Sequence, residues 1–322
     1  MMAVPVLLIT GFLGAGKTTL INRLLRDPQG RRLAAVVNDF GAIDIDAALL
    51  GSVIEDVISL KNGCICCSLQ GDLLRTLSMI LRRDPIPDGI VIETSGVSDP
   101  AEIVRSLLDP VIWKQAALDA VICVVDARTL VDQVDLMHDA LWQSQVQAAD
   151  YVALSKTDLV SEANAKQIEA MLCKYKPRTM IHALQDGHFP PELLFSADLH
   201  RPGQRLSTSL RTAMPVFQTM SWASEVSLSL TGFQRVIRDM AKVLVRAKGF
   251  VTFIERNGEP MLFQLVGSRA TLGRAPSCIV MMDAVRLVFI ARSGTLDEGA
   301  LRSSLQACRS GLNGSGRPPP VC

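Results

Sequence analysis

The sequence has 322 residues, of which 48% are hydrophobic and 20% charged, with 33 lysines and arginines against 32 aspartates and glutamates. This much apolar material excludes a globally disordered chain, and the near balance of charge gives no reason to expect binding to nucleic acid or to an anionic membrane. Because a single hydrophobic core rarely grows beyond about 250 to 300 residues, we expect one large domain and one smaller one.

The distribution of apolar residues and cysteines predicts a cytoplasmic protein. The longest apolar runs, such as 120–125 and 278–282, are far shorter than the roughly 20 residues of a membrane-spanning helix. The apolar N-terminus runs directly into a glycine-rich loop, so we expect no secretory signal. Eight cysteines, three of them crowded between positions 64 and 67, suit a reducing compartment better than a disulfide-linked scaffold.

From residue 4 to about 185, short β-branched runs alternate with amphipathic helical patterns, which is typical of a parallel sheet with crossover helices. The expected strands are 4–10, 34–38, 89–94, 120–126, 151–155 and 179–184. The first expected helix begins at Lys17 or Thr18, and the others cover 72–83, 101–108 and 163–174. We therefore predict that residues 1–185 form an α/β domain with a mostly parallel sheet flanked by helices.

The remainder of the chain predicts a second, smaller unit. Residues 186–213 contain prolines and glycines among scattered polar residues and are expected to be a linker. Beyond it, the patterns predict helices over 232–246 and 296–307, and strands over 250–255, 261–266 and 284–291. We expect a C-terminal α+β domain over 214–308, followed at 309–322 by a tail too rich in glycine and proline to pack.

The segment GFLGAGKTT lies between the first expected strand and the first expected helix. Its glycines allow successive backbone N–H groups to turn toward phosphate oxygens, where a Cβ would obstruct them. Lys17 can reach the β and γ phosphates, and Thr18 can offer its hydroxyl to magnesium. The residues expected to bind nucleotide here are Gly11, Gly14, Ala15, Gly16, Lys17, Thr18 and Thr19. The placement predicts a P-loop nucleotide hydrolase rather than a chance glycine-rich turn.

A magnesium-dependent hydrolase also needs a carboxylate at the end of a neighbouring strand. Glu93 ends IVIE and is the expected acid on the magnesium side, with Asp126 at the end of AVICVVD as its rival. Gly96 can offer its N–H to the γ-phosphate and move when that phosphate leaves. Asp39 lies where a first switch loop is expected, and either contacts water or magnesium or forms an Asx-turn. We assign Lys17, Asp39 and Glu93 as candidate catalytic residues.

The segment SKTD predicts which base is bound. The carboxylate of Asp158 can accept hydrogen bonds from the N1–H and the exocyclic amine of guanine, whereas adenine lacks this pair of donors. Lys156 would lay its aliphatic stem over the base, and Ser155 stands where asparagine is more usual. We expect GTP, and the alternative is ATP beside a coincidental turn.

Three cysteines, Cys64, Cys66 and Cys67, lie within NGCICC on a loop before an expected helix. Thiolates are soft donors that suit zinc, so we expect them to supply three ligands to a transition metal. A redox-active pair and three ordinary buried cysteines are the alternatives. By contrast, we expect Cys123 to be a core residue.

The segments GFLGAGKTTLINRLL, VVNDFG, NGCICC, IVIETSGVSDP, QAADYVALSKTDL and VRAKGF together resemble the CobW family of metal-associated P-loop GTPases. The resemblance implies a GTPase domain joined to a smaller C-terminal α+β domain, with zinc or cobalt bound at the Cys-x-Cys-Cys motif. It also implies that GTP hydrolysis gates delivery of the metal to a client protein. Asp39 and Ala42 stand where the family commonly has glutamates, and the linker has only His188 and His200, so bulk metal storage is not expected.

These features together predict a slow GTPase that acts as a metallochaperone, with GTP, magnesium and zinc or cobalt as cofactors. Its expected partner is a client metalloprotein bound through the C-terminal domain, and a nucleotide-dependent homodimer is a further state to consider. One alternative is a GTP-dependent assembly or activator protein for a metalloenzyme such as nitrile hydratase, which carries no metal itself. Another is a redox-responsive GTPase in which Cys66 and Cys67, or Cys64, react with oxidant.

Overall fold

The computed structural model describes residues 3–37, 57–59, 69–109, 112, 115–176, 179–190, 193–195, 217–267, 269–275 and 283–309. The chain divides into two compact units, 1–197 and 198–322. This boundary falls inside the segment 186–213 that the sequence predicts to be a linker. Most of that segment, and residues 310–322 of the expected tail, lie outside the described residues.

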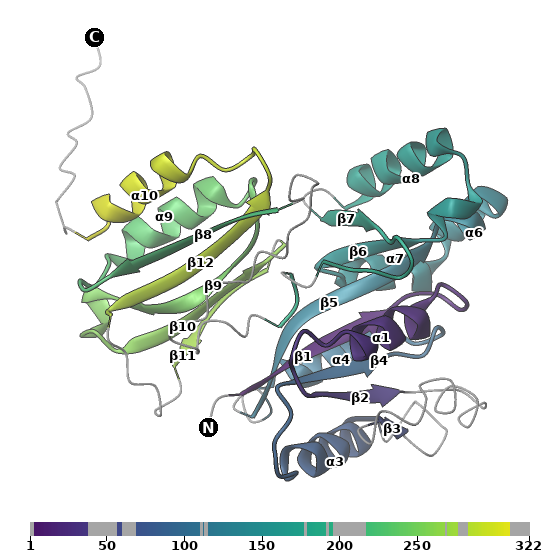
Figure 1. The fold of residues 1–322 in the computed structure, drawn as a ribbon, viewed down its shortest axis with the longest axis horizontal. Helices are drawn as coiled ribbons and strands as arrows, with labels where there is room; N and C mark the ends of the chain where they lie inside the picture. Colours follow the sequence, from purple (N-terminus) through teal and green to yellow (C-terminus); the bar gives the residue numbers. More distant parts are fainter. Residues whose placement is uncertain are drawn as a thin grey trace. The chain divides into compact units, whose positions relative to one another are not determined.

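In the described ranges of the first unit, seven parallel strands form one sheet in the order β3-β2-β4-β1-β5-β6-β7 (Figure 1). They are β1 (Val4–Thr10), β2 (Leu33–Val37), β3 (Val57–Ser59), β4 (Gly89–Glu93), β5 (Ala116–Asp126), β6 (Tyr151–Ser155) and β7 (Met180–Ala183). Every residue of β2, β4, β5 and β6 is buried. Helices therefore cover both faces of the sheet, which explains the continuous apolar runs of these strands.

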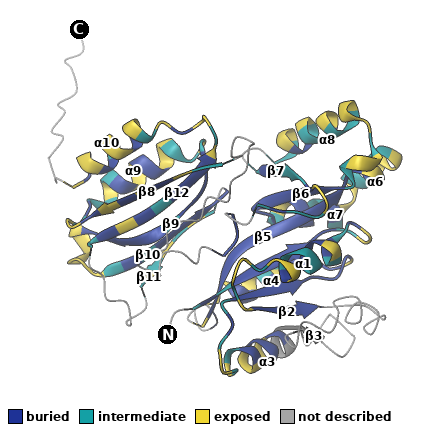
Figure 2. Ribbon diagram, viewed as in Figure 1, coloured by how far each residue is buried: buried dark blue, intermediate teal, exposed yellow. Residues whose placement is uncertain are grey.

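The helices of this unit place their apolar residues against the sheet. They are α1 (Lys17–Arg26), α3 (Leu69–Leu81), α4 (Pro100–Leu107), α6 (Ala127–Asp132), α7 (Ala140–Ala148) and α8 (Glu162–Tyr175). Leu73 and Leu77 of α3 are one turn apart and pack with strand residues in one core, while Ile168 and Leu172 of α8 pack in another. Figure 2 shows the exposed residues on the outer faces of the helices and the buried ones along the strands.

The carboxyl ends of β1, β4, β5 and β6 lie along one edge of the sheet because these strands are parallel and in register. Ile9 in β1 pairs with Glu93 in β4, and Asp126 in β5 pairs with Ser155 in β6. The loops that follow these strands therefore meet beyond the carboxyl ends of the strands, which is where open α/β sheets bind their ligands. The predicted P-loop NTPase fold with a parallel sheet is confirmed.

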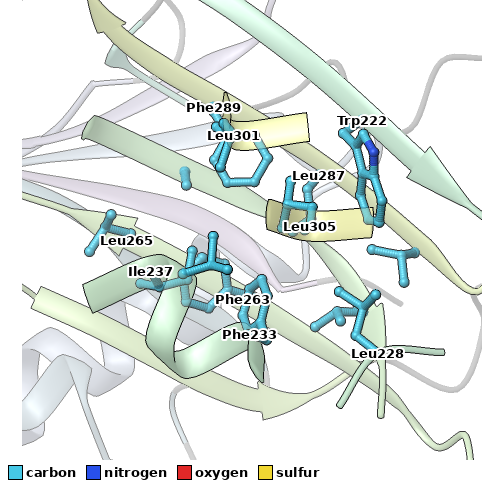
Figure 3. Close-up of a cluster of buried hydrophobic side chains, with 14 of the residues drawn as sticks. Trp222, Leu228, Phe233, Ile237, Phe263, Leu265, Leu287, Phe289, Leu301 and Leu305 are labelled. Atoms are coloured by element: carbon cyan, nitrogen blue, oxygen red, sulfur yellow. The ribbon is translucent and has the colours of Figure 1, made fainter. Parts of the chain in front are cut away.

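The second unit has an antiparallel sheet in the order β11-β10-β9-β12-β8. Its strands are β8 (Phe217–Ser224), β9 (Leu244–Thr252), β10 (Pro260–Val266), β11 (Arg269–Arg274) and β12 (Val285–Arg292). Helices α9 (Leu230–Met240) and α10 (Glu298–Ala307) cover one face of the sheet (Figure 1). Phe233, Phe263, Phe289, Leu301 and Leu305 meet in the core between them (Figure 3). This is the smaller α+β domain that the sequence predicts.

Two element boundaries in the second unit are predicted wrongly, and one of them is the end of the strand expected over 250–255, which ends at Thr252. The expected helix over 232–246 ends as α9 at Met240, and Leu244–Arg246 open strand β9 instead. β9 is hydrogen-bonded to β10 on one edge and to β12 on the other, so sheet pairing overrides the local helical preference of this segment. None of the helices in the described ranges is both long and apolar enough to cross a membrane.

Candidate nucleotide site

The loop between β1 and α1 has the backbone conformation that a phosphate-binding loop needs. Gly11, Gly14 and Gly16 adopt φ values of 140°, 70° and 99°. A Cβ on Gly11 would lie 2.2 Å from the backbone oxygen of Val124 in β5, so only glycine fits at this point. Glycine therefore lets the loop pass directly against β5, and the positive φ values give the backbone the turn that a phosphate-binding loop needs, so its residues fit a phosphate group.

The start of α1 is also arranged for an anion. Among the described residues, no side chain caps the helix at Gly16, and the positive end of the helix dipole therefore stays open toward the loop. Lys17 is 8% exposed, and its Nζ donates to the carbonyls of Gly11 at 3.0 Å and Phe12 at 3.1 Å. Its ammonium group is therefore held over the loop. Thr19, two residues on, is exposed.

Thr18 and Glu93 are in direct contact although they come from different elements. The Oγ1 of Thr18 donates to Oε1 of Glu93 at 3.1 Å, and Glu93 is only 6% exposed at the end of β4. A hydroxyl and a carboxylate are the hard oxygen ligands that magnesium takes. The two residues expected on the magnesium side are thus together beside the loop, and they fit that ion.

Asp126, the rival carboxylate, is engaged elsewhere. Its Oδ2 accepts from Lys156 Nζ at 2.6 Å and from Thr129 Oγ1 at 2.7 Å, while its Oδ1 accepts from the backbone N–H of Thr129 at 3.1 Å and caps α6. Burial pushes the pKa of this carboxyl up, but the hydrogen bonds from Lys156 and Thr129 outweigh burial and leave the pKa below its ordinary value. The geometry favours Glu93 over Asp126 on the magnesium side.

The segment predicted to bind the base lies directly beside the loop. Ser155 ends β6, and its hydroxyl donates to Ala15 O at 2.7 Å and Val125 O at 3.2 Å. Lys156 adopts a left-handed conformation with φ 55°, and its ion pair with Asp126 fixes the direction of its side chain. Asp158 is exposed in the short 3-10 helix η2 (Thr157–Leu159). The structure thus brings the SKTD segment and the P-loop together.

The turn after β4 packs against the P-loop. Thr94 Oγ1 donates to Thr10 Oγ1 at 3.0 Å, and a Cβ on Gly96 would lie 2.8 Å from the backbone nitrogen of Leu13. On its other side, the Nε2 of Gln145 donates to Gly96 O at 3.1 Å and to Ser98 O. Gln145 was not among the residues singled out from the sequence. Its position on the buried face of α7, beside Trp142 and Val146, is the signal that could have identified it, since a buried amide needs partners.

The remaining predicted site residues, Asp39, Cys64, Cys66 and Cys67, lie outside the described residues. Among the side chains that are described, no group of three or more histidines, cysteines, aspartates or glutamates is arranged to hold a metal ion. Cys123 is buried in β5, where burial raises the pKa of its thiol to about 12. Such a thiol stays protonated, so the expectation of a core cysteine at this position is confirmed.

Comparison with known proteins adds a family and several relatives. The family model "CobW/HypB/UreG, nucleotide-binding domain" matches residues 5–183, and "Cobalamin synthesis protein cobW C-terminal domain" matches 217–309. The zinc chaperone YjiA of Escherichia coli is 30% identical over 282 residues, which cover 81% of this chain and 85% of YjiA. The zinc chaperone CobW of a Sinorhizobium species is 34% identical over 208 residues.

The matched lengths differ between these relatives. The match to the Sinorhizobium protein covers 56% of this chain and 59% of that protein, which is less than two thirds of its length. Zinc-regulated GTPase metalloprotein activator 1 of Schizosaccharomyces pombe is 32% identical over 178 residues, which cover 53% of this chain and 43% of the activator. The similarity to both is therefore partial, whereas the similarity to YjiA extends over most of both chains.

Proposed function

Because this chain belongs to the CobW/HypB/UreG family, we propose that it is a GTPase metallochaperone that couples its nucleotide state to binding and delivery of a transition metal. The observation that carries the proposal is the 3.1 Å hydrogen bond between Thr18 and Glu93 beside the P-loop. It joins the two expected magnesium ligands, one from the first residues of α1 and one from the end of β4, beside the phosphate-binding loop. The names of the relatives, two zinc chaperones and a zinc-regulated activator, favour zinc over cobalt as the cargo.

Each residue of the site has a distinct role in the proposed hydrolysis. Lys17 and the N-terminus of α1 neutralise the phosphate oxygens, and Gly11, Gly14 and Gly16 leave room for them. Thr18 and Glu93 hold magnesium, which when bound neutralises charge on the phosphates. Asp39 remains the predicted partner of the attacking water. Catalysis of this kind depends on positioning and electrostatics more than on covalent chemistry.

The base is selected at the other end of the site. Asp158 accepts the two N–H groups of guanine, and its exposed position leaves its carboxylate open to a ligand. Lys156 covers the base with its aliphatic stem, and its ammonium group is held by Asp126. Ser155 contributes by fixing the P-loop through Ala15 rather than by an amide contact with the base.

The metal cargo is assigned to Cys64, Cys66 and Cys67, whose thiolates suit zinc. These cysteines lie in sequence between Asp39 and the turn at Gly96, the two segments expected to respond to the γ-phosphate. A rearrangement of either segment can therefore reach the cysteine loop. In this mechanism the GTP state holds the metal, and hydrolysis releases it.

The proposal extends to partners and location. The client is a metalloprotein that docks on the C-terminal domain, and GTP favours a homodimer of the chain. Light scattering with a GTP analogue and with GDP tests the dimer, which is contradicted by equal masses in the two states. A cytoplasmic location follows from the crowded thiols, which need a reducing compartment.

The decisive experiment is a zinc titration against a chromogenic chelator, with the protein bound to a GTP analogue, bound to GDP, and free of nucleotide. We expect tightest zinc binding with the analogue, and equal affinity in all three states would refute the coupling. Elemental analysis of the purified protein beside a C64S/C66S/C67S variant addresses the activator alternative, which requires no bound metal in either. Thiol counting before and after mild peroxide addresses the redox alternative.

A further inference from the structure

Gln145 is a completely buried residue of α7, and the turn that follows β4 separates its side-chain amide from the P-loop. Its exposed fraction is 0%, and its Nε2 donates to Gly96 O at 3.1 Å and to Ser98 O at 3.2 Å. Both acceptors belong to the turn that follows β4 and lie more than 45 residues away in sequence. One side chain of α7 thus donates to two carbonyls of this turn that lie two residues apart.

The opposite side of the turn touches the P-loop. Gly96 lies so close to Leu13 that an added Cβ would be 2.8 Å from the Leu13 nitrogen and 2.9 Å from its Cα. Thr94 is joined to Thr10 by its hydroxyl, immediately before the loop. The turn is therefore packed between the phosphate-binding loop and Gln145, and any shift of the turn must change its contacts on both sides.

Helix α7 is itself fixed at several points. Ser144 Oγ donates to Asp99 Oδ1 at 2.6 Å, and Asp99 also caps α4. The ammonium of Lys176 donates to Val146 O at 3.3 Å, to Gln147 O at 2.6 Å and to Ala149 O, and so caps the C-terminus of α7. These bonds make α7 a firm support for the amide of Gln145.

Two buried polar groups in this arrangement have no hydrogen-bond partner among the described residues. They are Oε1 of Gln145 and the hydroxyl of Ser98, which is 5% exposed. Nε2 already bonds to two carbonyls, so the orientation of the amide is determined and Oε1 must be the acceptor. Buried polar groups are rarely left without partners, and such a pair calls for an explanation. The unpartnered donor is the Ser98 hydroxyl and the unpartnered acceptor is Gln145 Oε1. These two residues are already joined by the hydrogen bond from Gln145 Nε2 to Ser98 O.

We propose that Gln145 is a positioning residue for GTP hydrolysis, which holds the turn 94–98 against the P-loop through Gly96 and Ser98. We further assign a second hydrogen bond, which the Ser98 hydroxyl donates to Gln145 Oε1 when the turn moves with the γ-phosphate. The turn then has two hydrogen-bonded arrangements, and nucleotide selects between them. This inference rests on the proposed GTPase function.

The test compares Q145L with Q147L, a matched change of an exposed glutamine on the same helix. GTP turnover and the affinities for a fluorescent GTP analogue and for GDP are measured for both variants and for the unaltered protein. We expect Q145L to lower kcat by about tenfold to a hundredfold, because small misplacements of a site cost this much. We also expect Q145L to reduce the preference for the analogue over GDP, and Q147L to change neither quantity. A merely structural role would lower thermal stability without altering the nucleotide preference.

A second variant, S98A, removes a hydroxyl that makes no hydrogen bond among the described residues, so it leaves the fold intact even if Q145L does not fold. We expect S98A to change the ratio of analogue to GDP affinity. The inference is overturned if Q145L matches Q147L, or if Q145L fails to fold and S98A matches the unaltered protein. Absence of GTP turnover in the unaltered protein would instead count against the proposed function itself.

Discussion

The hydroxyl of Ser155 donates a hydrogen bond of 2.7 Å to the carbonyl of Ala15, across 140 residues of sequence. This bond joins the end of β6, where the base is expected, to the loop where the phosphates are expected. The same hydroxyl also reaches Val125 O in β5. Ser155 therefore ties together the two halves of the nucleotide site.

The S155A variant should weaken GTP binding. Loss of one buried hydrogen bond costs about 1 kcal/mol, which corresponds to about fivefold in affinity. Titration with a fluorescent GTP analogue measures the change, with S303A, at an exposed serine of α10, as the control. If S155A and S303A bind alike, the bond does not contribute to the site.

The variants T18A and E93Q should each raise the magnesium concentration needed for GTP turnover. T18A removes the hydroxyl ligand, and E93Q replaces the charged carboxylate with a neutral amide, in the pair that lies 3.1 Å apart, so we expect kcat to fall by at least about tenfold. Nucleotide affinity measured with EDTA should change far less. The rival carboxylate provides the control, because D126N should leave the magnesium dependence unaltered.

Asp126 should contribute to stability in a pH-dependent manner. Its hydrogen bonds leave the folded-state pKa below the ordinary value of 3.8. Its contribution is therefore fully present above pH 3.8 and is lost as the pH falls through the lower folded-state value. Urea unfolding should show that the unaltered protein has a larger free energy of unfolding than D126N. This difference should be constant at neutral pH and become smaller in acid. A difference that becomes larger in acid, or one that D135N reproduces at an exposed aspartate, would contradict this assignment.

The variant D158N should change the base preference of the nucleotide site from guanine to xanthine. Xanthine carries a carbonyl oxygen where guanine carries the exocyclic amine, and an asparagine amide can donate to that oxygen while its own oxygen accepts from N1–H. We expect GTP turnover to fall and XTP turnover to rise, because a mismatched polar contact strongly reduces binding. Equal losses with both nucleotides would show that Asp158 does not read the base.

The G96A variant tests the contact between the turn and the P-loop. Its new Cβ would meet the Leu13 backbone at 2.8 Å, so the turn or the loop must shift. We expect GTP turnover to fall sharply while GDP binding is largely kept. G299A, at an exposed position of α10 where an added Cβ would make only an ordinary 3.4 Å contact with Asp297 Oδ1, controls for general effects of the extra methyl group.

The motif-bearing part of the chain could be predicted in detail. Strands at Val4–Thr10 and Tyr151–Ser155 and a helix starting at Lys17 occur as expected, because uniform apolar runs beside glycine leave few alternatives. The resemblance to the CobW family, drawn from the same segments, is confirmed. The sequence already favours Glu93 over Asp126 on the magnesium side, but both carboxylates end buried strands, and only the coordinates show that Glu93 contacts Thr18 while Asp126 is bonded to Lys156 and Thr129.

Other features depend on contacts that local patterns do not contain. Strand β11 alternates intermediate and exposed residues at the edge of its sheet and offers almost no apolar signal. Leu244 begins a strand because it pairs with Ala291 of β12, not because of its own preference. The partners of Gln145 lie 47 and 49 residues away, so their pairing is a property of the folded chain.

The two compact units have separate hydrophobic cores, and this affects how ligands stabilise the protein. Multidomain chains commonly unfold in more than one step, so a single melting temperature does not describe them. Nucleotide stabilises only the cooperative unit that holds the P-loop, by an amount that rises with ligand concentration. Calorimetry should therefore show two heat-absorption peaks, and GTP analogue should move one of them upward while the other stays in place.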